Sequence, residues 1–313
     1  MTSNPPFVVT GNRIDPLGPL KATGVRLTSF MVPASTAKCQ TMLDAMFATP
    51  SGGRVRFRML GNRVVLGAAE ITRIFATDML ERRNGWATEI DFGLWVPAVR
   101  EGDGLFAIRM IPLYLFVDVA AAMAGGREVW GFPKQTGRFD FTPQTADPAA
   151  ARTFHAEGYA LKTFAPTTEA GWAHIATISP ILKPGGGGIL GDLKRFAEQI
   201  FDDMAEGAGE VAGRIAAAFG GGSVTMAFLK QFPDAADPTT ACYQAIVEAK
   251  STVDKLKAAG ITRNHYTVDI SSYASLPMAQ ELGIPSGPQA VGQGFWVEFD
   301  FTMDLGKEIW RAT

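Results

Sequence analysis

One lysine stands in an apolar setting at residues 130–138, which read WGFPKQTGR. Lys134 follows a tryptophan, a phenylalanine and a proline, and a long apolar run precedes them. Burial disfavours the charged ammonium and lowers the pKa of a lysine, and the resulting neutral amine can attack a carbonyl carbon. Alternatively, the stem of Lys134 packs on Trp130 while its ammonium reaches water. The spacing alone leaves both interpretations open.

Other patterns that carry chemistry are weak in this sequence. Gly186, Gly188 and Gly191 match the G-x-G-x-x-G pattern of dinucleotide sites, but four consecutive glycines match many patterns, and a flexible hinge explains them at least as well. The three histidines lie apart from one another and from acidic residues at metal-ligand spacing, so we expect no metal site. The sequence also lacks the G-x-S-x-G motif of serine hydrolases.

The composition favours a protein that acts on a small molecule. Lys and Arg number 29 and Asp and Glu number 31, and the net charge of −2 gives no field that would attract nucleic acid or an anionic membrane. The N-terminus lacks a secretory signal pattern, and no window is apolar enough for a membrane helix, so we expect a cytoplasmic protein. Cys39 and Cys242 lie far apart without CxxC spacing, which predicts two buried thiols.

The elements that position Lys134 are predicted to be mainly β-strands. Between residues 54 and 117, short segments rich in Val, Ile, Phe and Trp alternate with the turn signals GN, RNG and EGDG. This close spacing favours antiparallel pairing over strand-helix-strand units. Alternating stretches continue to residue 303, whereas residues 35–47 carry apolar side chains at helical spacing. The sequence therefore predicts a β architecture with one early helix.

Residues 185–222 differ from the rest of the chain. Glycine runs stand at both ends, and two apolar stripes at helical spacing between them predict two short amphipathic helices. We expect a hinged helical insert within one domain that spans residues 1–313. The insert either packs on the strands, forms a subunit contact, or covers a site as a lid.

The run GREVWGFPK at residues 126–134 resembles the signature of the acetoacetate decarboxylase family, in which the lysine forms a Schiff base. Other stretches fall in matching order. Arg26 in VRLTSFMVP is similar to an active-site arginine of the family, and Glu70 and Glu89 are similar to its two active-site glutamates. The segments AFLKQFPD, YQAIVEAK and GFWVEFDFTMDLGKEIW resemble its later strands. The resemblance covers most of residues 20–312, apart from the predicted insert.

This resemblance implies a carbon–carbon lyase that works without a metal or an organic cofactor. Lys134 would attack the ketone of a small keto acid, and the iminium ion would accept the electrons of the bond that breaks. Arg26 would hold the substrate carboxylate through its guanidinium group. Glu89 would transfer protons, and Glu70 would orient Arg26 or Glu89, unless Glu70 is an ordinary charge on a solvent-facing strand.

The residue after the lysine departs from the family pattern. The decarboxylases have a second lysine there, whose charge has been held to lower the pKa of the first, whereas this chain has Gln135. Desolvation by Trp130, Phe132 and their neighbours would then have to supply most of the pKa shift. We expect Trp130, Phe132 and Gln135 to border the substrate.

The sequence thus predicts an α+β fold in which a mainly antiparallel β-sheet closes into a barrel-like cone. We expect it to decarboxylate acetoacetate or a related β-keto acid. Because of Gln135, a pyruvate aldolase-dehydratase that uses the same lysine is a serious alternative. A small-molecule binding protein that kept the pocket without turnover is a third reading. Members of the family are typically homo-oligomers, and we expect the same here.

Overall fold

The computed structural model describes residues 7–8, 17–77, 85–104, 107–184 and 222–312, and within them the chain is mostly β-sheet with few helices. The strands are β1 (Leu20–Pro33), β2 (Phe57–Met59), β3 (Arg63–Ala76), β4 (Ala87–Arg100), β5 (Ile108–Val117), β6 (Lys134–Thr142), β7 (Thr153–Ala160), β8 (Gly171–Pro184), β9 (Ser223–Pro233), β10 (Ala241–Ile270), β11 (Gln289–Met303) and β12 (Lys307–Arg311). The helices are α1 (Thr36–Leu43), α2 (Ala120–Gly125) and α5 (Met278–Leu282), and the π-helical turns are η1 (Asp44–Ala48) and η3 (Gly126–Trp130).

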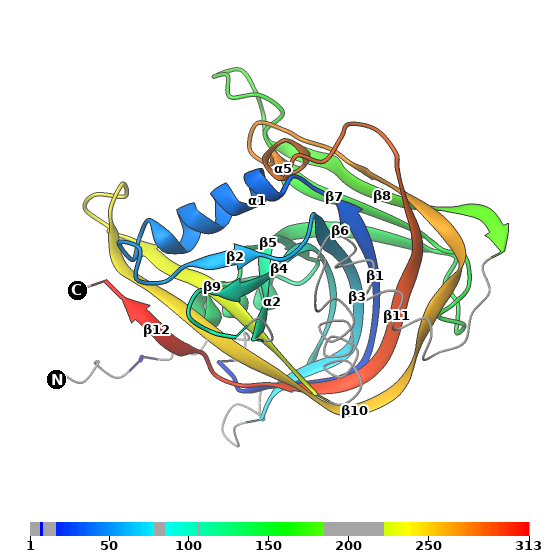
Figure 1. The fold of residues 1–313 in the computed structure, drawn as a ribbon, viewed down its shortest axis with the longest axis horizontal. Helices are drawn as coiled ribbons and strands as arrows, with labels where there is room; N and C mark the ends of the chain where they lie inside the picture. The colour runs from blue at the N-terminus through cyan, green and yellow to red at the C-terminus, as the bar shows by residue number, and fades with distance from the viewer. Residues whose placement is uncertain (1–6, 9–16, 78–84, 105–106, 185–221, 313) are drawn as a thin grey trace.

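The strands form one sheet arranged as a ring. Hydrogen-bonded neighbours follow the order β2-β4-β3-β1-β11-β10-β8-β7-β6-β5-β9. Strand β4 also pairs with β5, which joins distant members of this order, and Figure 1 shows the resulting ring of strands. The prediction of a mainly antiparallel β-sheet is confirmed, and the more specific cone shape stays a prediction.

Two pairings in the sheet are parallel, and both involve β5, which lies beside β6 and β9. Parallel neighbours need a crossover connection, because the chain must return to the end of the sheet from which it started. Helix α2 and turn η3 make this crossover between β5 and β6. Lys134 is the first residue of β6, so the crossover determines where the lysine enters the sheet.

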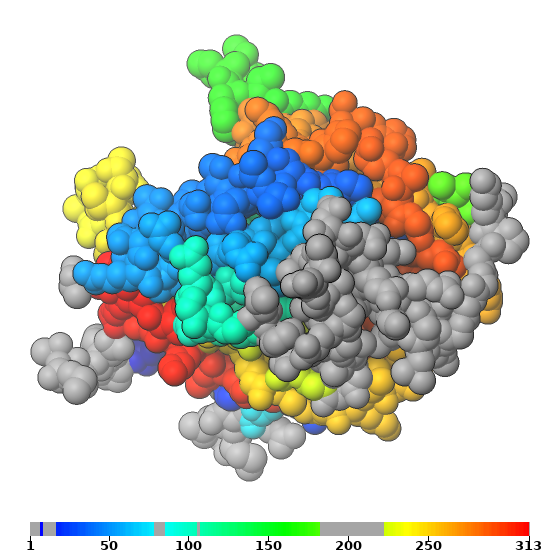
Figure 2. Space-filling view, viewed as in Figure 1, coloured from blue at the N-terminus to red at the C-terminus, as the bar shows by residue number. Residues whose placement is uncertain are grey.

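The helix predicted at residues 35–47 is confirmed as α1 followed by η1. The Ser35 side chain accepts a hydrogen bond from the backbone N–H of Lys38 and caps the helix. In Figure 2 this segment forms part of the outer surface. None of the described helices is long and apolar enough to cross a membrane. Cys39 of α1 is buried as expected, but the prediction for Cys242 is wrong, since it lies exposed beside the turn from β9 to β10.

Strands β1 and β3 contribute side chains to a hydrophobic cluster on each face of the sheet, since successive side chains of a strand point to opposite sides. On β3, Val64 and Leu66 belong to the hydrophobic core that includes α1, whereas Val65 and Ile71 belong to a second cluster on the other face. It is this second face that borders the candidate site. The helical insert predicted at residues 185–222 lies outside the described residues, except for Gly222.

Candidate active site

A cavity of about 370 Å³ lies beside the second face of β1 and β3. Strands β4, β5, β9, β10 and β11 and the crossover α2–η3 contribute further lining residues. Most of the lining is apolar, and Trp86, which is 56% exposed, belongs to it as well. Among the described residues, the lining side chains that carry a hydroxyl, a carboxylate or an ammonium group are Ser29, Glu89, Asp91, Lys134 and Ser251.

Lys134 is buried in this lining, with 7% of its surface exposed. Its Nζ lies 2.5 Å from Oε1 of Glu89 and 3.8 Å from Oδ1 of Asp91. The same Nζ lies 5.5 Å from the ring centroid of Phe132. The alternative in which the ammonium of Lys134 reaches water is therefore wrong, and the structure brings Lys134 and Glu89 together inside the protein.

The pKa of Lys134 shifts in the direction opposite to the one that burial alone would give. Burial alone lowers the pKa of Lys134, but the carboxylates of Asp91 and Glu89 raise it more, and the net direction is upward from its ordinary value. Burial likewise raises the pKa of Glu89, yet the ammonium of Lys134 outweighs it and lowers that pKa. Both directions favour the charged forms, so Lys134 and Glu89 form an ion pair in this structure, whereas the interpretation as a neutral amine considered burial alone.

Asp91 is a site residue that the sequence reasoning missed. It lies two positions after Glu89 on β4, so both side chains point to the cavity face. Burial and the charge of Glu89 raise the pKa of Asp91 well above its ordinary value. The pair in TEID at residues 88–91 could have indicated this, because two carboxylates at a spacing of two share one face of a strand. No described group of three or more His, Cys, Asp or Glu side chains is arranged to hold a metal ion.

The turn before Lys134 explains several residues of GREVWGFPK. Gly131 ends η3 with φ +93°, a conformation that favours glycine, and a Cβ there would come within 2.7 Å of Lys230 Cα. Arg127 donates a hydrogen bond of 3.1 Å to the carbonyl of Lys134. The stem of Lys134 lies over Gly126, where a Cβ would be 2.8 Å from Lys134 Cδ. The motif therefore shapes the backbone and leaves room for the lysine side chain.

Trp130 and Phe132 line the cavity, and both are buried. The Trp130 indole donates a hydrogen bond of 2.9 Å to the carbonyl of Asp304, which fixes the ring against the last strands. Gln135 is not among the lining residues, because it follows Lys134 on β6 and points to the opposite face. Its predicted contact with substrate does not fit this placement.

Arg26 and Glu70 are not brought into the cavity. They are cross-strand partners on β1 and β3, and both face away from the lining residues beside them. The register of β1 against β11 shifts between Ala22 and Val25, and the register of β3 against β4 shifts between Ile71 and Ile74. Each irregularity adds one residue to its strand. Side chains at odd-numbered positions therefore face the cavity on one side of it, and those at even-numbered positions on the other side. The structure therefore does not bring Arg26 to the cavity, where it was predicted to hold the substrate carboxylate. Glu70, predicted to orient Arg26 or Glu89, accepts its hydrogen bonds from Arg152 instead.

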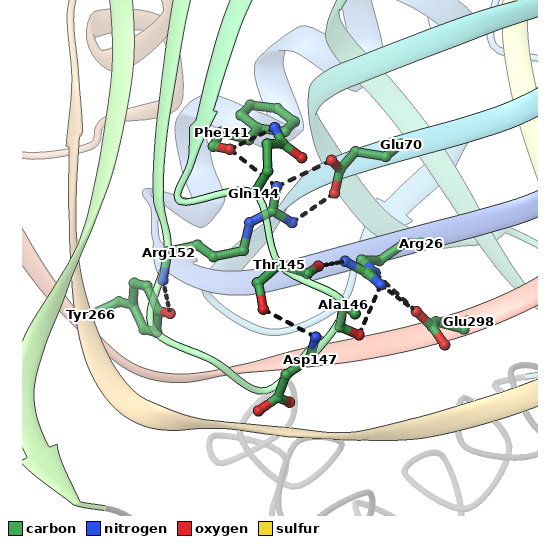
Figure 3. A network of polar contacts seen from close by, with 10 residues as sticks. All are labelled: Arg26, Glu70, Phe141, Gln144, Thr145, Ala146, Asp147, Arg152, Tyr266 and Glu298. Atoms are coloured by element: carbon green, nitrogen blue, oxygen red, sulfur yellow. Dashed lines mark hydrogen bonds and ion pairs between the residues drawn. The ribbon is translucent and has the colours of Figure 1, made fainter.

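Arg26 and Glu70 belong instead to a polar network that anchors the connection between β6 and β7 (Figure 3). Arg26 donates hydrogen bonds to Glu298, at 2.9 Å, and to the carbonyl of Thr145, at 2.7 Å. Arg152, which is 2% exposed, donates to both carboxylate oxygens of Glu70, at 2.7 and 3.1 Å. Two-point pairing of this kind is strong and fixes the orientation of both groups.

A family model described as acetoacetate decarboxylase matches residues 88–311, which is most of the chain. The chain belongs to the acetoacetate decarboxylase family. This confirms the resemblance that GREVWGFPK carries. Glu89, Asp91 and Lys134 lie within the part that matches the acetoacetate decarboxylase model, whereas Arg26 and Glu70 lie before it.

Solved structures of this family and similar enzymes share the fold at low sequence identity. An acetoacetate decarboxylase from Legionella pneumophila is 16% identical with a TM-score of 0.61, and the match covers 99% of this chain and 93% of that chain. An acetoacetate decarboxylase-like enzyme from Sphingomonas wittichii RW1 is 13% identical with a TM-score of 0.55, covering 93% and 92%. The enduracididine biosynthesis enzyme MppR, complexed with pyruvate, is 14% identical with a TM-score of 0.51, covering 94% and 91%. A comparison with curated proteins gave no significant match.

The position of Gly126 gives a first prediction. Gly126→Ala keeps a helical backbone, but its Cβ displaces the stem of Lys134. We expect the rate of borohydride trapping of a ketone on Lys134 to fall about 100-fold, because small displacements of a reacting group cost this much. The control is Gly104→Ala, where a Cβ would meet nothing within 4 Å. Equal trapping rates in the two variants would contradict the packing argument.

The network in Figure 3 gives a second prediction. Glu70→Gln leaves the buried Arg152 guanidinium without its countercharge, and we expect the free energy of unfolding in urea to fall by about 3 kcal/mol. The matched change Glu298→Gln concerns a more exposed pair, with side chains 21% and 29% exposed, and should cost at most about 1 kcal/mol. Loss of lysine reactivity in folded Glu70→Gln protein would argue for a role of Glu70 at the site.

Proposed function

We propose that the protein is a Schiff-base lyase that decarboxylates a β-keto acid on Lys134. The observation that carries the proposal is the Lys134–Glu89 ion pair in an apolar cavity, with the carboxyl group of Asp91 on the same wall. Family membership supports an enzyme of this general kind.

The first stage is formation of the imine. Glu89 accepts a proton from the Lys134 ammonium when substrate displaces water, because a neutral pair is favoured over an ion pair in an apolar space. The free amine then attacks the ketone carbon and forms a carbinolamine. Glu89 returns its proton to the carbinolamine hydroxyl, water leaves, and a positively charged iminium ion remains beside the Glu89 carboxylate.

The second stage is loss of CO2. The electrons of the bond to the substrate carboxylate move into the iminium group, CO2 leaves, and an enamine forms. Burial and the charge of Glu89 raise the pKa of Asp91, which favours its protonated form once the Lys134 ammonium has been consumed, and this carboxyl group donates its proton to the enamine carbon. Water then hydrolyses the new iminium ion with Glu89 as the base, which releases the ketone and the amine, and Asp91 regains a proton from solvent. The net reaction consumes one proton and needs no electron acceptor other than the imine.

The lining of the cavity favours decarboxylation over aldol chemistry on pyruvate. Among the described lining residues, Lys134 is the one that carries a positive charge. A carboxylate that stays on the substrate, as in pyruvate, would lack a cationic partner there once Lys134 has become an iminium ion paired with Glu89. A β-keto acid instead converts its carboxylate into neutral CO2, and an apolar space favours this loss of charge.

Pyruvate aldolase-dehydratase activity remains the alternative, supported by Gln135 after the lysine and by the fold shared with MppR, whose structure contains pyruvate. A binding protein without turnover is the other alternative.

Borohydride reduction separates these possibilities. Incubation with acetoacetate and borohydride should add the mass of the reduced imine at Lys134, and CO2 should be released without borohydride. Lys134→Ala should lose both signals, because no other lysine lines the described cavity. Lys162→Ala, on an exposed lysine, serves as control and should keep both. Consumption of pyruvate with an aldehyde, without CO2 release from any β-keto acid, would favour the aldolase. If borohydride trapped no keto acid on Lys134, the imine mechanism would be contradicted.

Asp91 can be tested separately from Lys134. Asp91→Asn cannot donate the proton to the enamine carbon, so we expect kcat to fall by about 100-fold or more while borohydride still traps substrate on Lys134. In the unchanged protein, kcat should fall as pH rises through the raised pKa of Asp91, since only the protonated carboxyl group acts. The asparagine variant should lose this pH dependence. Full activity of Asp91→Asn would remove Asp91 from the mechanism.

A further inference from the structure

The cavity around Lys134 is larger than acetoacetate needs. Its volume of about 370 Å³ falls in the range of pockets that enclose drug-sized ligands. Since one water occupies about 30 Å³ in the liquid, the space corresponds to roughly a dozen water-sized groups. Acetoacetate would fill only about half of it. A substrate matched to the cavity therefore carries additional atoms beyond the keto acid group.

The extra space lies along an apolar wall. On β3, Ala69 and Ile71 pair with Asp91 and Glu89, and the lining continues from them to Val65 in one direction and to Ala76 in the other. With a rise of about 3.3 Å per residue, Val65 is about 13 Å from Ala69 along the strand. The wall thus extends beyond the reach of a short substrate that is bound covalently to Lys134.

Small side chains create this space, and large apolar ones enclose it. The small lining residues are Gly67, Ala69, Ala87, Ala121, Ala122 and Gly125. The rings of Trp95, Phe132 and Phe299 face the same cavity. Away from the group formed by Lys134, Glu89 and Asp91, the polar side-chain groups of the described lining are the hydroxyls of Ser29 and Ser251 and the indole N–H groups of its tryptophans. A tail with charges or many hydrogen-bonding groups would lose its hydration here without replacement, whereas an alkyl chain would not.

We propose that the substrate is a medium-chain 3-oxo acid, whose ketone reacts with Lys134 while its alkyl tail fills the apolar cavity. This inference rests on the proposed Schiff-base function and names the substrate class for that site. The space corresponds to an acid of about eight carbons. The reaction converts the 3-oxo carboxylate and one proton into a methyl ketone and CO2, so the product keeps the apolar tail.

The test measures how tail length changes imine formation, without any need for decarboxylation. A series from acetone through 2-pentanone and 2-heptanone to 2-nonanone is incubated with the protein and borohydride, and the mass added at Lys134 is followed. Each buried methylene should lower the half-maximal ketone concentration about fourfold, so 2-heptanone, with four more methylenes, should act at a concentration about 250-fold below that of acetone. The series of 3-oxo acids of matching length is then assayed for CO2 release.

Two variants show whether the effect of tail length on trapping arises inside the cavity. Ala87→Phe adds bulk to the cavity face of β4, and Thr88→Phe adds the same bulk to the exposed face one residue later. The quantity compared is the half-maximal concentration of acetone divided by that of 2-heptanone. We expect Ala87→Phe to reduce this ratio at least tenfold and Thr88→Phe to leave it unchanged. A ratio within one protein does not depend on the fraction that folds.

The outcomes separate this inference from the proposed function. If acetoacetate loses CO2 but tail length brings no gain in trapping, or if Ala87→Phe and Thr88→Phe behave alike, the substrate class is wrong and the decarboxylase stands. If longer ketones are trapped better but no 3-oxo acid releases CO2, the apolar tail pocket stands and decarboxylation is wrong. Absence of trapping with every ketone overturns both.

Discussion

An ammonium and a carboxylate meet 2.5 Å apart at Lys134 and Glu89, inside a cavity with an apolar lining. Removing two charges from water is costly, and their mutual attraction offsets the cost only when the geometry is well defined. The chain supplies that geometry from two strands that both pair with β5, since β4 carries Glu89 and β6 begins at Lys134. The crossover between β5 and β6 then determines the position along the sheet at which β6 begins with Lys134.

The same ion pair changes how the lysine can become reactive. Desolvation alone would leave a neutral amine at rest, but here the charges of Asp91 and Glu89 oppose it. In the proposed mechanism the proton rests beside the amine and moves to Glu89 when substrate excludes water. This arrangement needs no second lysine beside the first. Gln135 is not among the lining residues, because it follows Lys134 directly on β6 and its side chain lies on the other face of the strand.

Much of the site could be predicted from local sequence, and the reasons for the misses are physical. The motif around Lys134 predicted its apolar neighbours because Trp130 and Phe132 are close to it in the chain as well as in space. The strands and α1 could be predicted from the spacing of apolar residues, because this spacing depends on which side of each segment is buried. The pKa of Lys134 could not be predicted, because it depends on carboxylates from another strand. Asp91 was overlooked although its spacing from Glu89 places both on one face.

The faces of β1 and β3 were the hardest feature to predict, since the paired irregularities near Gly24 and Arg73 reverse the alternation within each strand. The Thr72 hydroxyl donates a hydrogen bond of 2.9 Å to the carbonyl of Gly24 across them. Loss of one residue from each strand at this point would exchange inward and outward positions on one side. The extra residue in β1 thus lets Leu20 and Val25 both line the cavity, although an odd number of positions separates them and an unbroken strand would place them on opposite faces.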